Sequence, residues 1–478
     1  MALPDPIEIV PLAAPVRAEI TVPGSKSITN RALILAALAD GEVMLKGALW
    51  SEDTQIMVEC LKQLGFVVNV APDPDEVCNR TIMVVGEAGL IPPGGTETEP
   101  LDLFVGNAGT AARFLAPFLC LGSGVYRLHG VPRMHERPQA ALFQALRELG
   151  YRVEAENDND KLPARIFAGT AGQPPDSMTE FIQRKQIAPV PKQCRVSIAE
   201  SSQFASALLL SSEVGGWDIE IEGENAEESP YVVMTQKLMA VFPKKGGTFQ
   251  IEPDASSGSY FWAVSALASQ AATGLANMSI YELALAFTQG TKPERVFAVR
   301  VPNWPDSGWQ IDQDFPRLLR PPADFPGIVS RITNLGDSIM TAIVITPLGT
   351  KLSQFADLGR LRVQECERVH SLKTELTKCG AKVVEEGDTL TVYPAKPGEL
   401  HGAEIETYND HRMAMCFAIL GLKIPGMKIK KPACVKKTFP NFFQKLAAPP
   451  PHGLGAKIWE IKNGRRTRKL SGDDLFAD

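Results

Sequence analysis

The 478-residue sequence lacks most of the features that mark secreted, membrane-bound or metal-binding proteins. Its eight cysteines are scattered and no two of them form a Cys-x-x-Cys pair, which fits neither a zinc site nor a disulfide framework and favours a reducing compartment. No run of about 18 uncharged apolar residues is present, so we expect no membrane-spanning helix. The first ten residues, MALPDPIEIV, carry acids and prolines instead of the basic and apolar runs of a targeting peptide. We therefore expect a cytoplasmic protein.

An excess of basic charge is also missing. The chain has 49 Lys and Arg against 55 Asp and Glu, for a net charge of -6, so no overall positive field would attract nucleic acid or a membrane surface. Any anion-binding site must be built locally. The composition, with 44% hydrophobic and 22% charged residues, is that of an ordinary globular protein, and the length predicts two or three domains.

The stretch Pro23–Ala39, PGSKSITNRALILAALA, places cations at the start of a predicted buried helix. Its Pro-Gly pair ends a short strand, and the apolar run from Ala32 to Ala39 predicts a helix buried behind a polar tip. A helix N-terminus carries roughly +0.5 charge and unpaired N–H groups, so Lys26 and Arg31 would make it attractive to phosphate or carboxylate. Taken alone, the stretch is weak evidence, and a capped helix with two solvated cations is the simpler interpretation.

The chain repeats this design. Five further segments begin with small or polar residues and become apolar: Asn107–Leu121, Ser201–Ser212, Ala255–Ser269, Asp337–Ile345 and Asn409–Leu422. An amphipathic helix ended by glycine and followed by a strand is predicted at Thr54–Val70, Pro138–Val153, Pro230–Phe242 and Glu365–Val384, with a shortened copy at Phe442–Ala447. The pattern predicts six copies of an α/β unit in two groups of three.

Three segments do not follow the repeat. Between Asn277 and Asn334 the second helix of the fourth copy is hard to find, and the segment is rich in Pro, Trp and Asp, which predicts irregular structure. Thr170–Lys192, with four prolines, predicts a linker. From Ala447 onward the chain is polar and contains the basic run KNGRRTRK, so we expect a solvated, dispensable tail without a core of its own.

The starts of the predicted buried helices share a consistent chemistry, in which most side chains can bind anions and Asp337 is an acid. They are Lys26, Ser27 and Arg31; Asn107, Gly109, Thr110 and Arg113; Ser201, Ser202 and Gln203; Asp337; and His411 and Arg412. If the copies pack as two groups of three, we expect these tips to converge on one cleft. Many donors and few acids suit ligands with several negative charges.

Eight motifs, taken in order, resemble the successive signatures of the EPSP synthase family, the 3-phosphoshikimate 1-carboxyvinyltransferases. They are PGSKSITNRALILAALA, VGNAGTAARFL, HERPQ, SSQFASALL, GDSIMTA, LRVQECERV, YNDHRMAM and KKTFPNFF. The resemblance covers about Pro11 to Ala448. It implies two inside-out α/β domains, each of three βαβαββ repeats around buried helices, with the substrate cleft between them. We expect residues 1–24 and 254–447 in the first domain, 25–253 in the second, and 448–478 as the polar tail.

The resemblance also implies the chemistry. The enolpyruvyl group of phosphoenolpyruvate would be transferred to the 5-hydroxyl of shikimate 3-phosphate with release of phosphate, a step of aromatic amino acid biosynthesis. It implies no cofactor, no metal, no nucleic-acid or membrane partner and a monomeric state. The herbicide glyphosate would compete with phosphoenolpyruvate.

Site residues follow from the resemblance position by position. Those expected to hold shikimate 3-phosphate are Lys26, Ser27, Arg31, Ser201, Ser202, Gln203, Tyr231, Asp337 and Gln364. Those expected around phosphoenolpyruvate are Lys26, Asn107, Gly109, Thr110, Arg137, Gln203, Arg368, His411, Arg412 and Lys437. Asp337 is expected to act as base, with Glu365 and Lys26 in the proton transfers at C3 and at the leaving phosphate. The division of these proton transfers stays open, and a helix N-terminal acid is the alternative interpretation of Glu365.

Three positions depart from the family pattern. Gln364 stands where a substrate-contacting lysine is common, and Glu228 replaces a usual serine, next to Ser229. Phe114 stands where many members have proline, and its bulk could tilt the first turn of the helix that begins at Asn107 and weaken glyphosate binding.

Two rival functions are weighed against this one. The related transferase acting on UDP-N-acetylglucosamine typically has a cysteine in the loop that here reads RMHERP, from Arg133 to Pro138, and that loop has none. A non-catalytic anion-binding protein would bind anions better without the carboxylates of Asp337 and Glu365.

Overall fold

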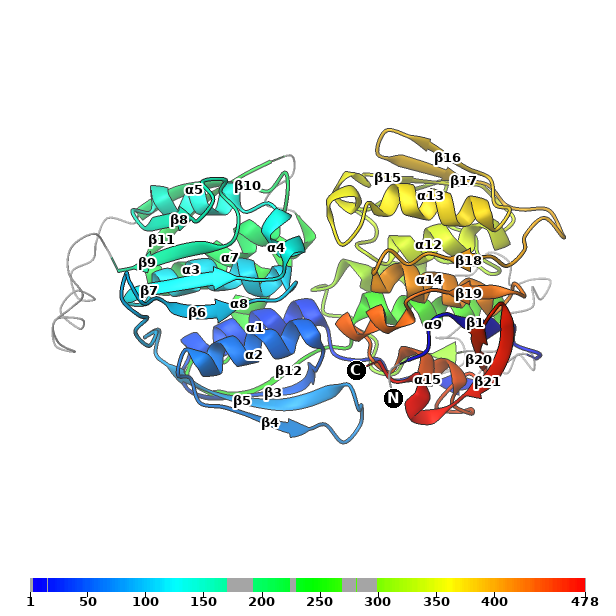
Figure 1. Ribbon diagram of the computed structural model, residues 1–478, viewed down its shortest axis with the longest axis horizontal. Helices are drawn as coiled ribbons and strands as arrows, with labels where there is room; N and C mark the ends of the chain where they lie inside the picture. The colour runs from blue at the N-terminus through cyan, green and yellow to red at the C-terminus, as the bar shows by residue number, and fades with distance from the viewer. Residues whose placement is uncertain are drawn as a thin grey trace. The chain divides into compact units, whose positions relative to one another are not determined.

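The computed structural model describes residues 3–14, 16–169, 192–223, 229–268, 281 and 299–477, and they fold into two compact units (Figure 1). Unit 1 comprises Met1–Pro23, Asp75–Cys78 and Glu252–Asp478, and unit 2 comprises Gly24–Pro74 and Asn79–Ile251. Most of the predicted linker at 170–192, Glu228 and much of the segment 277–298 lie outside the described residues. Among the helices of the described ranges, none combines the length and apolar character needed to cross a membrane.

Unit 2 contains three sheets. Two have four strands, in the orders β12 (Gly247–Gln250), β3 (Asp40–Leu49), β5 (Asn79–Glu87), β4 (Val68–Pro72), and β6 (Leu101–Phe104), β7 (Gly124–His129), β9 (Ala164–Ala168), β8 (Arg152–Ala155). The third pairs β10 (Lys192–Ser197) with β11 (Trp217–Glu222) in parallel. In each four-stranded sheet the first pair is parallel and the next two are antiparallel. This is the pairing that a βαβαββ repeat produces.

Each sheet of unit 2 has one buried helix and one outer helix. The buried helices are α1 (Lys26–Leu38), α3 (Gly109–Cys120) and α7 (Gln203–Gly215), which contact one another. The outer ones are α2 (Glu52–Gln63), α5 (Ala140–Glu148) and α8 (Pro230–Val241), with a short α4 (Pro132–Glu136) before α5. All residues of α3 are buried. A helix that is enclosed on every side can present polar groups to a ligand only at its ends.

Unit 1 follows the same plan. Its sheets are β14 (Ile328–Ser330), β15 (Ser353–Ala356), β17 (Thr389–Val392), β16 (Val383–Glu386); β13 (Val299–Arg300) with β2 (Ala18–Glu19); and β18 (Glu404–Ile405), β19 (Met427–Ile429), β1 (Ile7–Val10), β20 (Lys457–Lys462), β21 (Arg465–Leu470). The outer helices are α13 (Arg368–Lys378) and α15 (Phe442–Ala447). The predicted two-domain α/β fold of repeated units is therefore confirmed.

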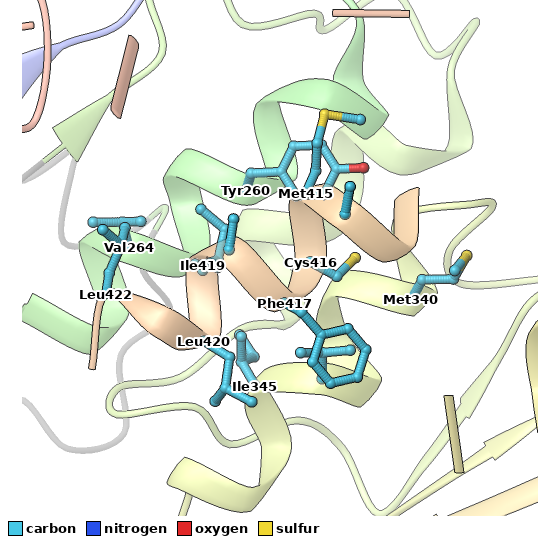
Figure 2. Packing of buried hydrophobic residues seen from close by; sticks show 14 of the residues in the cluster. Tyr260, Val264, Met340, Ile345, Met415, Cys416, Phe417, Ile419, Leu420 and Leu422 are labelled. Atoms are coloured by element: carbon cyan, nitrogen blue, oxygen red, sulfur yellow. The ribbon is translucent and has the colours of Figure 1, made fainter. Parts of the chain in front are cut away.

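Three buried helices form the centre of unit 1. They are α9 (Ala255–Ala268), α12 (Ile339–Ile345) and α14 (His411–Gly421), and each contacts the other two. Figure 2 shows their side chains, among them Tyr260, Met340 and Phe417, gathered in one core. All six predicted buried helices are thus present in the structure. The described part of the segment predicted to be irregular contains a short 3-10 helix, η1 (Ile311–Asp314), and a short α-helix, α11 (Phe315–Leu318), as well as strands β13 and β14.

The predicted solvated tail is wrong, because residues 448–478 belong to unit 1 and add two strands to its sheet. β20 pairs antiparallel with β1, which lies between β19 and β20 (Figure 1). Ile458, Ile461 and Leu470 are buried, and Arg466 donates two 2.8 Å hydrogen bonds to the buried Glu8. The polar composition of this segment comes mainly from β21, an edge strand whose side chains are mostly exposed. Because the prediction used the average composition of the segment, it missed the buried apolar residues of β20.

We therefore expect truncation after Ala448 to destabilise the protein, since β1 would become an unprotected edge strand. Each fully buried Ile or Leu that is lost removes on the order of 1.5–3 kcal/mol. Thermal unfolding followed by circular dichroism should show a melting temperature lower by at least several degrees, or an insoluble product. The control exchanges the exposed Arg465 and Lys469 for serine and should melt like the full chain. Equal melting temperatures for the truncated and full chains would contradict the docking of the two strands.

Candidate active site

In unit 1, Asp337 lies just before α12 and is surrounded by arginines. Its Oδ1 accepts a 2.7 Å hydrogen bond from Nη2 of Arg331, and its Oδ2 lies 3.2 Å from Arg412 Nη2 and 3.9 Å from Arg368 Nη1. Burial by itself raises the pKa of Asp337, but Arg412, Arg331 and Arg368 outweigh burial and hold that pKa well below its usual range. Asp337 is therefore ionised at neutral pH.

Glu365 forms a second acidic position in the same cluster. Its Oε2 lies 2.9 Å from Arg368 Nη2, and its Oε1 accepts a 3.0 Å hydrogen bond from Lys437 Nζ. The side chain that caps α13 is instead Glu367, which accepts a 2.5 Å hydrogen bond from the His370 amide. Glu365 lies three residues before α13 and its carboxylate faces cations that belong to the predicted site.

Arg368 connects the two acids and is almost completely buried. Asp410 holds it through Nε at 2.6 Å and Nη2 at 3.2 Å, and Gln364 Oε1 accepts a hydrogen bond from its Nη1. Burial lowers the pKa of Arg368, but Asp410, Glu365 and Asp337 outweigh it and raise the pKa. A lysine at position 364 could not accept this bond, so the departure from the family pattern gives Arg368 an additional partner.

Asp410 also organises the start of α14. Its Oδ1 accepts a 2.8 Å hydrogen bond from the Arg412 amide and so caps the helix. The neighbouring His411 is buried, with Nδ1 3.7 Å from Asp410 Oδ1. One carboxylate therefore fixes both Arg368 and the first turn that carries Arg412.

In unit 2, Arg31 is buried and bonded within the protein. It donates to Thr235 Oγ1 at 2.7 Å, Ser206 Oγ at 2.9 Å and the Ser27 carbonyl at 2.9 Å. Its guanidinium carbon lies 5.1 Å from the centre of the Phe114 ring and 5.9 Å from that of Tyr231. Burial lowers the pKa of Arg31 to about 10. Arg31 thus ties α1 to α3, α7 and α8, and Phe114 packs beneath its charge.

Gln203, the first residue of α7, is oriented by two neighbours. Its Oε1 accepts a 2.6 Å hydrogen bond from Arg113, and its Nε2 donates to Thr110 Oγ1 at 3.2 Å. The backbone amide of Gln203 also donates a 3.2 Å hydrogen bond to Ser201 Oγ. Ser202, which lies between these two residues in the sequence, is buried. The starts of α3 and α7 are therefore in contact, which brings Thr110, Ser201, Ser202 and Gln203 of the predicted site together.

Arg137 lies beside the start of α3. Arg137 donates a 3.2 Å hydrogen bond to the carbonyl of Asn107. A Cβ atom placed on Gly109 would lie 2.5–2.7 Å from three atoms of the Arg137 guanidinium. Only glycine lets the guanidinium rest this closely on the first turn of α3.

Lys26 is the first residue of α1 and is paired with Asp53, which is not among the predicted site residues. Its Nζ donates to Asp53 Oδ2 at 3.2 Å, and Asp53 is buried in the first turn of α2. Asp53 and Asp410 could have been found as acids in or beside the first turn of a predicted helix. Arg331 carries no such signal, because it follows a short strand in the irregular segment.

Comparisons with known proteins identify the family of the chain. Residues 11–446 match the family model described as EPSP synthase (3-phosphoshikimate 1-carboxyvinyltransferase). Curated relatives named 3-phosphoshikimate 1-carboxyvinyltransferase include that of Nostoc punctiforme, 35% identical over 92% of this chain and 98% of the relative. That of Opitutus terrae is 37% identical over 94% of this chain and 98% of the relative.

Solved structures show the same fold at low identity. EPSP synthase from Acinetobacter baumannii aligns over 95% of this chain and 99% of its own, with a TM-score of 0.60 and 18% identity. The enolpyruvyl transferase NikO from Streptomyces tendae aligns over 98% of this chain and 100% of its own, with a TM-score of 0.59 and 13% identity. The family match over nearly the whole length, together with the relatives above 30% identity, shows that this chain belongs to the EPSP synthase family.

Proposed function

We propose that this chain transfers the enolpyruvyl group of phosphoenolpyruvate to the 5-hydroxyl of shikimate 3-phosphate, with Asp337 as the base. Family membership supports the overall reaction, which belongs to the shikimate pathway. The observation that carries the assignment of Asp337 is the position of its carboxylate, held between Arg331, Arg368 and Arg412. The arginines fix the orientation of this carboxylate and weaken it as a base, but it keeps an oxygen that can accept a proton.

The reaction adds the acceptor and then eliminates phosphate. The 5-hydroxyl loses its proton to Asp337 as its oxygen bonds to C2 of phosphoenolpyruvate, and C3 gains a proton. The tetrahedral intermediate then breaks its C2–O bond to phosphate and loses a proton from C3, while the leaving phosphate is protonated. Glu365 and Lys26 serve the transfers at C3 and at the phosphate.

Cations and hydroxyls bind the anionic groups. Arg368, Arg412 and Lys437 in unit 1, and Lys26 and Arg137 in unit 2, serve phosphoenolpyruvate. Asn107, Gly109, Thr110, Gln203 and His411 complete that set. Ser27, Arg31, Ser201, Ser202, Gln203, Tyr231 and Gln364 serve shikimate 3-phosphate, with Arg31 and Gln364 acting through the side chains they hold. A hydrogen bond to a charged group contributes about 1.5–3 kcal/mol, so several are needed for two multiply charged ligands.

We further infer a monomeric enzyme of the cytoplasm that glyphosate inhibits in competition with phosphoenolpyruvate. All eight cysteines are free thiols, as suits a reducing compartment. Phe114 is buried beneath Arg31, so any effect of this residue on the inhibitor passes through Arg31 and the position of α3.

Replacing either acid should abolish most turnover. Asp337→Asn and Glu365→Gln keep the shape of the side chain and remove its charge, so each should lower kcat at least about 100-fold. Release of phosphate from phosphoenolpyruvate and shikimate 3-phosphate measures this directly. The exposed Glu399 provides the control, and Glu399→Gln should match the unmodified protein. Turnover within tenfold of that protein would remove the replaced acid from the mechanism.

The same assay separates the rival functions. With UDP-N-acetylglucosamine as acceptor we expect no phosphate release, and with shikimate 3-phosphate we expect rapid release. Release with the nucleotide sugar alone would identify the related transferase. Binding of both substrates without any release would identify a non-catalytic anion-binding protein.

Gly109→Ala tests the role of Arg137. The added methyl group would occupy the position of the Arg137 guanidinium, which must move away from the start of α3. We expect the KM for phosphoenolpyruvate and the inhibition constant of glyphosate to rise together, each about tenfold, which corresponds to about 1.4 kcal/mol. The control is Gly327→Ala, where an added Cβ meets nothing within 4 Å. An unchanged KM would show that Arg137 does not bind this substrate.

A further inference from the structure

Asp312 is a buried carboxylate from the Pro-, Trp- and Asp-rich segment that carried no predicted function. It lies in the short turn η1 and is 4% exposed. It is not one of the residues assigned to substrate binding or proton transfer. A buried acid needs partners to offset its loss of hydration, so the position of those partners indicates what it does.

The partners of Asp312 flank Asp337 on both sides. Its Oδ1 accepts hydrogen bonds from the Gly336 amide at 2.7 Å, the Ser338 amide at 3.1 Å and Ser338 Oγ at 2.5 Å. Its Oδ2 accepts a hydrogen bond from Ser256 Oγ, in the first turn of α9. One carboxylate thus fixes the backbone before and after the proposed base.

The turn fits closely around this carboxylate. A Cβ atom on Gly336 would lie 3.1 and 3.2 Å from the two carboxylate oxygens of Asp312, and 3.0 Å from Ile311 Cγ2. Such distances are shorter than ordinary van der Waals contact, so the backbone at Gly336 approaches η1 as far as a residue without a side chain allows.

Gln310 anchors the other end of the same short segment. Its Oε1 accepts a 3.0 Å hydrogen bond from the Ala255 amide, the first residue of α9. Its Nε2 donates to Glu252 Oε2 at 3.0 Å and to the Pro253 carbonyl at 2.9 Å. Residues 310–312 are therefore fixed to the start of α9, and Asp312 transmits that fixed position to the start of α12.

We propose that Asp312 is a positioning residue for the reaction and holds the Gly336–Ser338 turn so that Asp337 meets its three arginines. The inference rests on the proposed role of Asp337 as base. Without the Asp312 carboxylate, two buried amides lose their acceptor, and the turn must shift to recover partners. A displacement of about 1 Å at a reacting group can cost about 100-fold in rate.

The alternative is that Asp312 only stabilises the core. If Asp312 only stabilises the core, its effect does not depend on Asp337. Its replacement would then change kcat by the same factor whether or not Asp337 is present. A residue that acts through Asp337 loses its effect on kcat once Asp337 has been removed. A double-mutant cycle separates these cases.

The cycle combines Asp312→Ala with Asp337→Ala, and kcat and KM are measured from steady-state phosphate release. We expect Asp312→Ala alone to lower kcat at least about 30-fold with KM changed less than about threefold, and to lower kcat less than about twofold when Asp337 is already alanine. Asp312→Asn should restore kcat to within about fivefold, because its oxygen can still accept from both amides while its NH₂ group donates to Ser256 Oγ.

Two further variants keep the test decisive. Asp312→Glu retains the charge but pushes an extra methylene toward Gly336, so it should also lower kcat only when Asp337 is present, and it serves if the alanine variant does not fold. Ser259→Ala is the matched control, because it removes a buried hydroxyl of α9 that bonds Ser256 O and Thr341 Oγ1 but not Asp312.

Equal losses with and without Asp337, or an equal loss in Ser259→Ala, would overturn the positioning role. Turnover by Asp337→Ala near that of the unmodified protein would instead refute Asp337 as base, and the positioning role with it. If Asp337→Ala retains measurable turnover at least about 100-fold below that of the unmodified protein and the Asp312 effect is additive, only the positioning role fails.

Discussion

The site in unit 1 depends on the pairing of buried arginines with carboxylates where α12, α13 and α14 begin. Burying a charge costs several kcal/mol unless it is paired, and the contacts of this cluster meet that requirement. Arg368 lies against Asp410, Glu365 and Asp337, while Arg331 and Arg412 share Asp337. The order of the site depends on this mutual pairing, since the loss of any carboxylate would leave arginines facing one another.

In unit 2 the buried charge of Arg31 is stabilised by a different set of partners. Among the described residues, the guanidinium of Arg31 is enclosed by two rings and donates its hydrogen bonds to hydroxyl and carbonyl oxygens. These neutral groups stabilise its positive charge within the described part of unit 2. Unit 1 holds acids that are suited to proton transfer, whereas Arg31 in unit 2 holds α1, α3, α7 and α8 together beside Ser27 and Tyr231.

The sequence predicted the buried helices because each helix begins with a local signal, such as the lysine and arginine after Pro23 or the acid and cation at Asp410 and Arg412. Features that depend on distant pairing were missed. The tail appeared too polar for a core, yet β20 finds its partner more than 440 residues earlier in β1. Asp312 and Arg331 lie in a segment without periodicity, and only the fold brings them to Asp337.

Asp337, fixed by three arginines, is proposed to receive the proton of the attacking hydroxyl. A crystal structure of the protein with shikimate 3-phosphate bound would show whether it can. We expect the Asp337 carboxylate within hydrogen-bond distance, about 2.5–3.0 Å, of the 5-hydroxyl oxygen, with Arg331 still on Oδ1. A 5-hydroxyl bonded to another acid, or an Asp337 side chain turned away from the ligand, would contradict it.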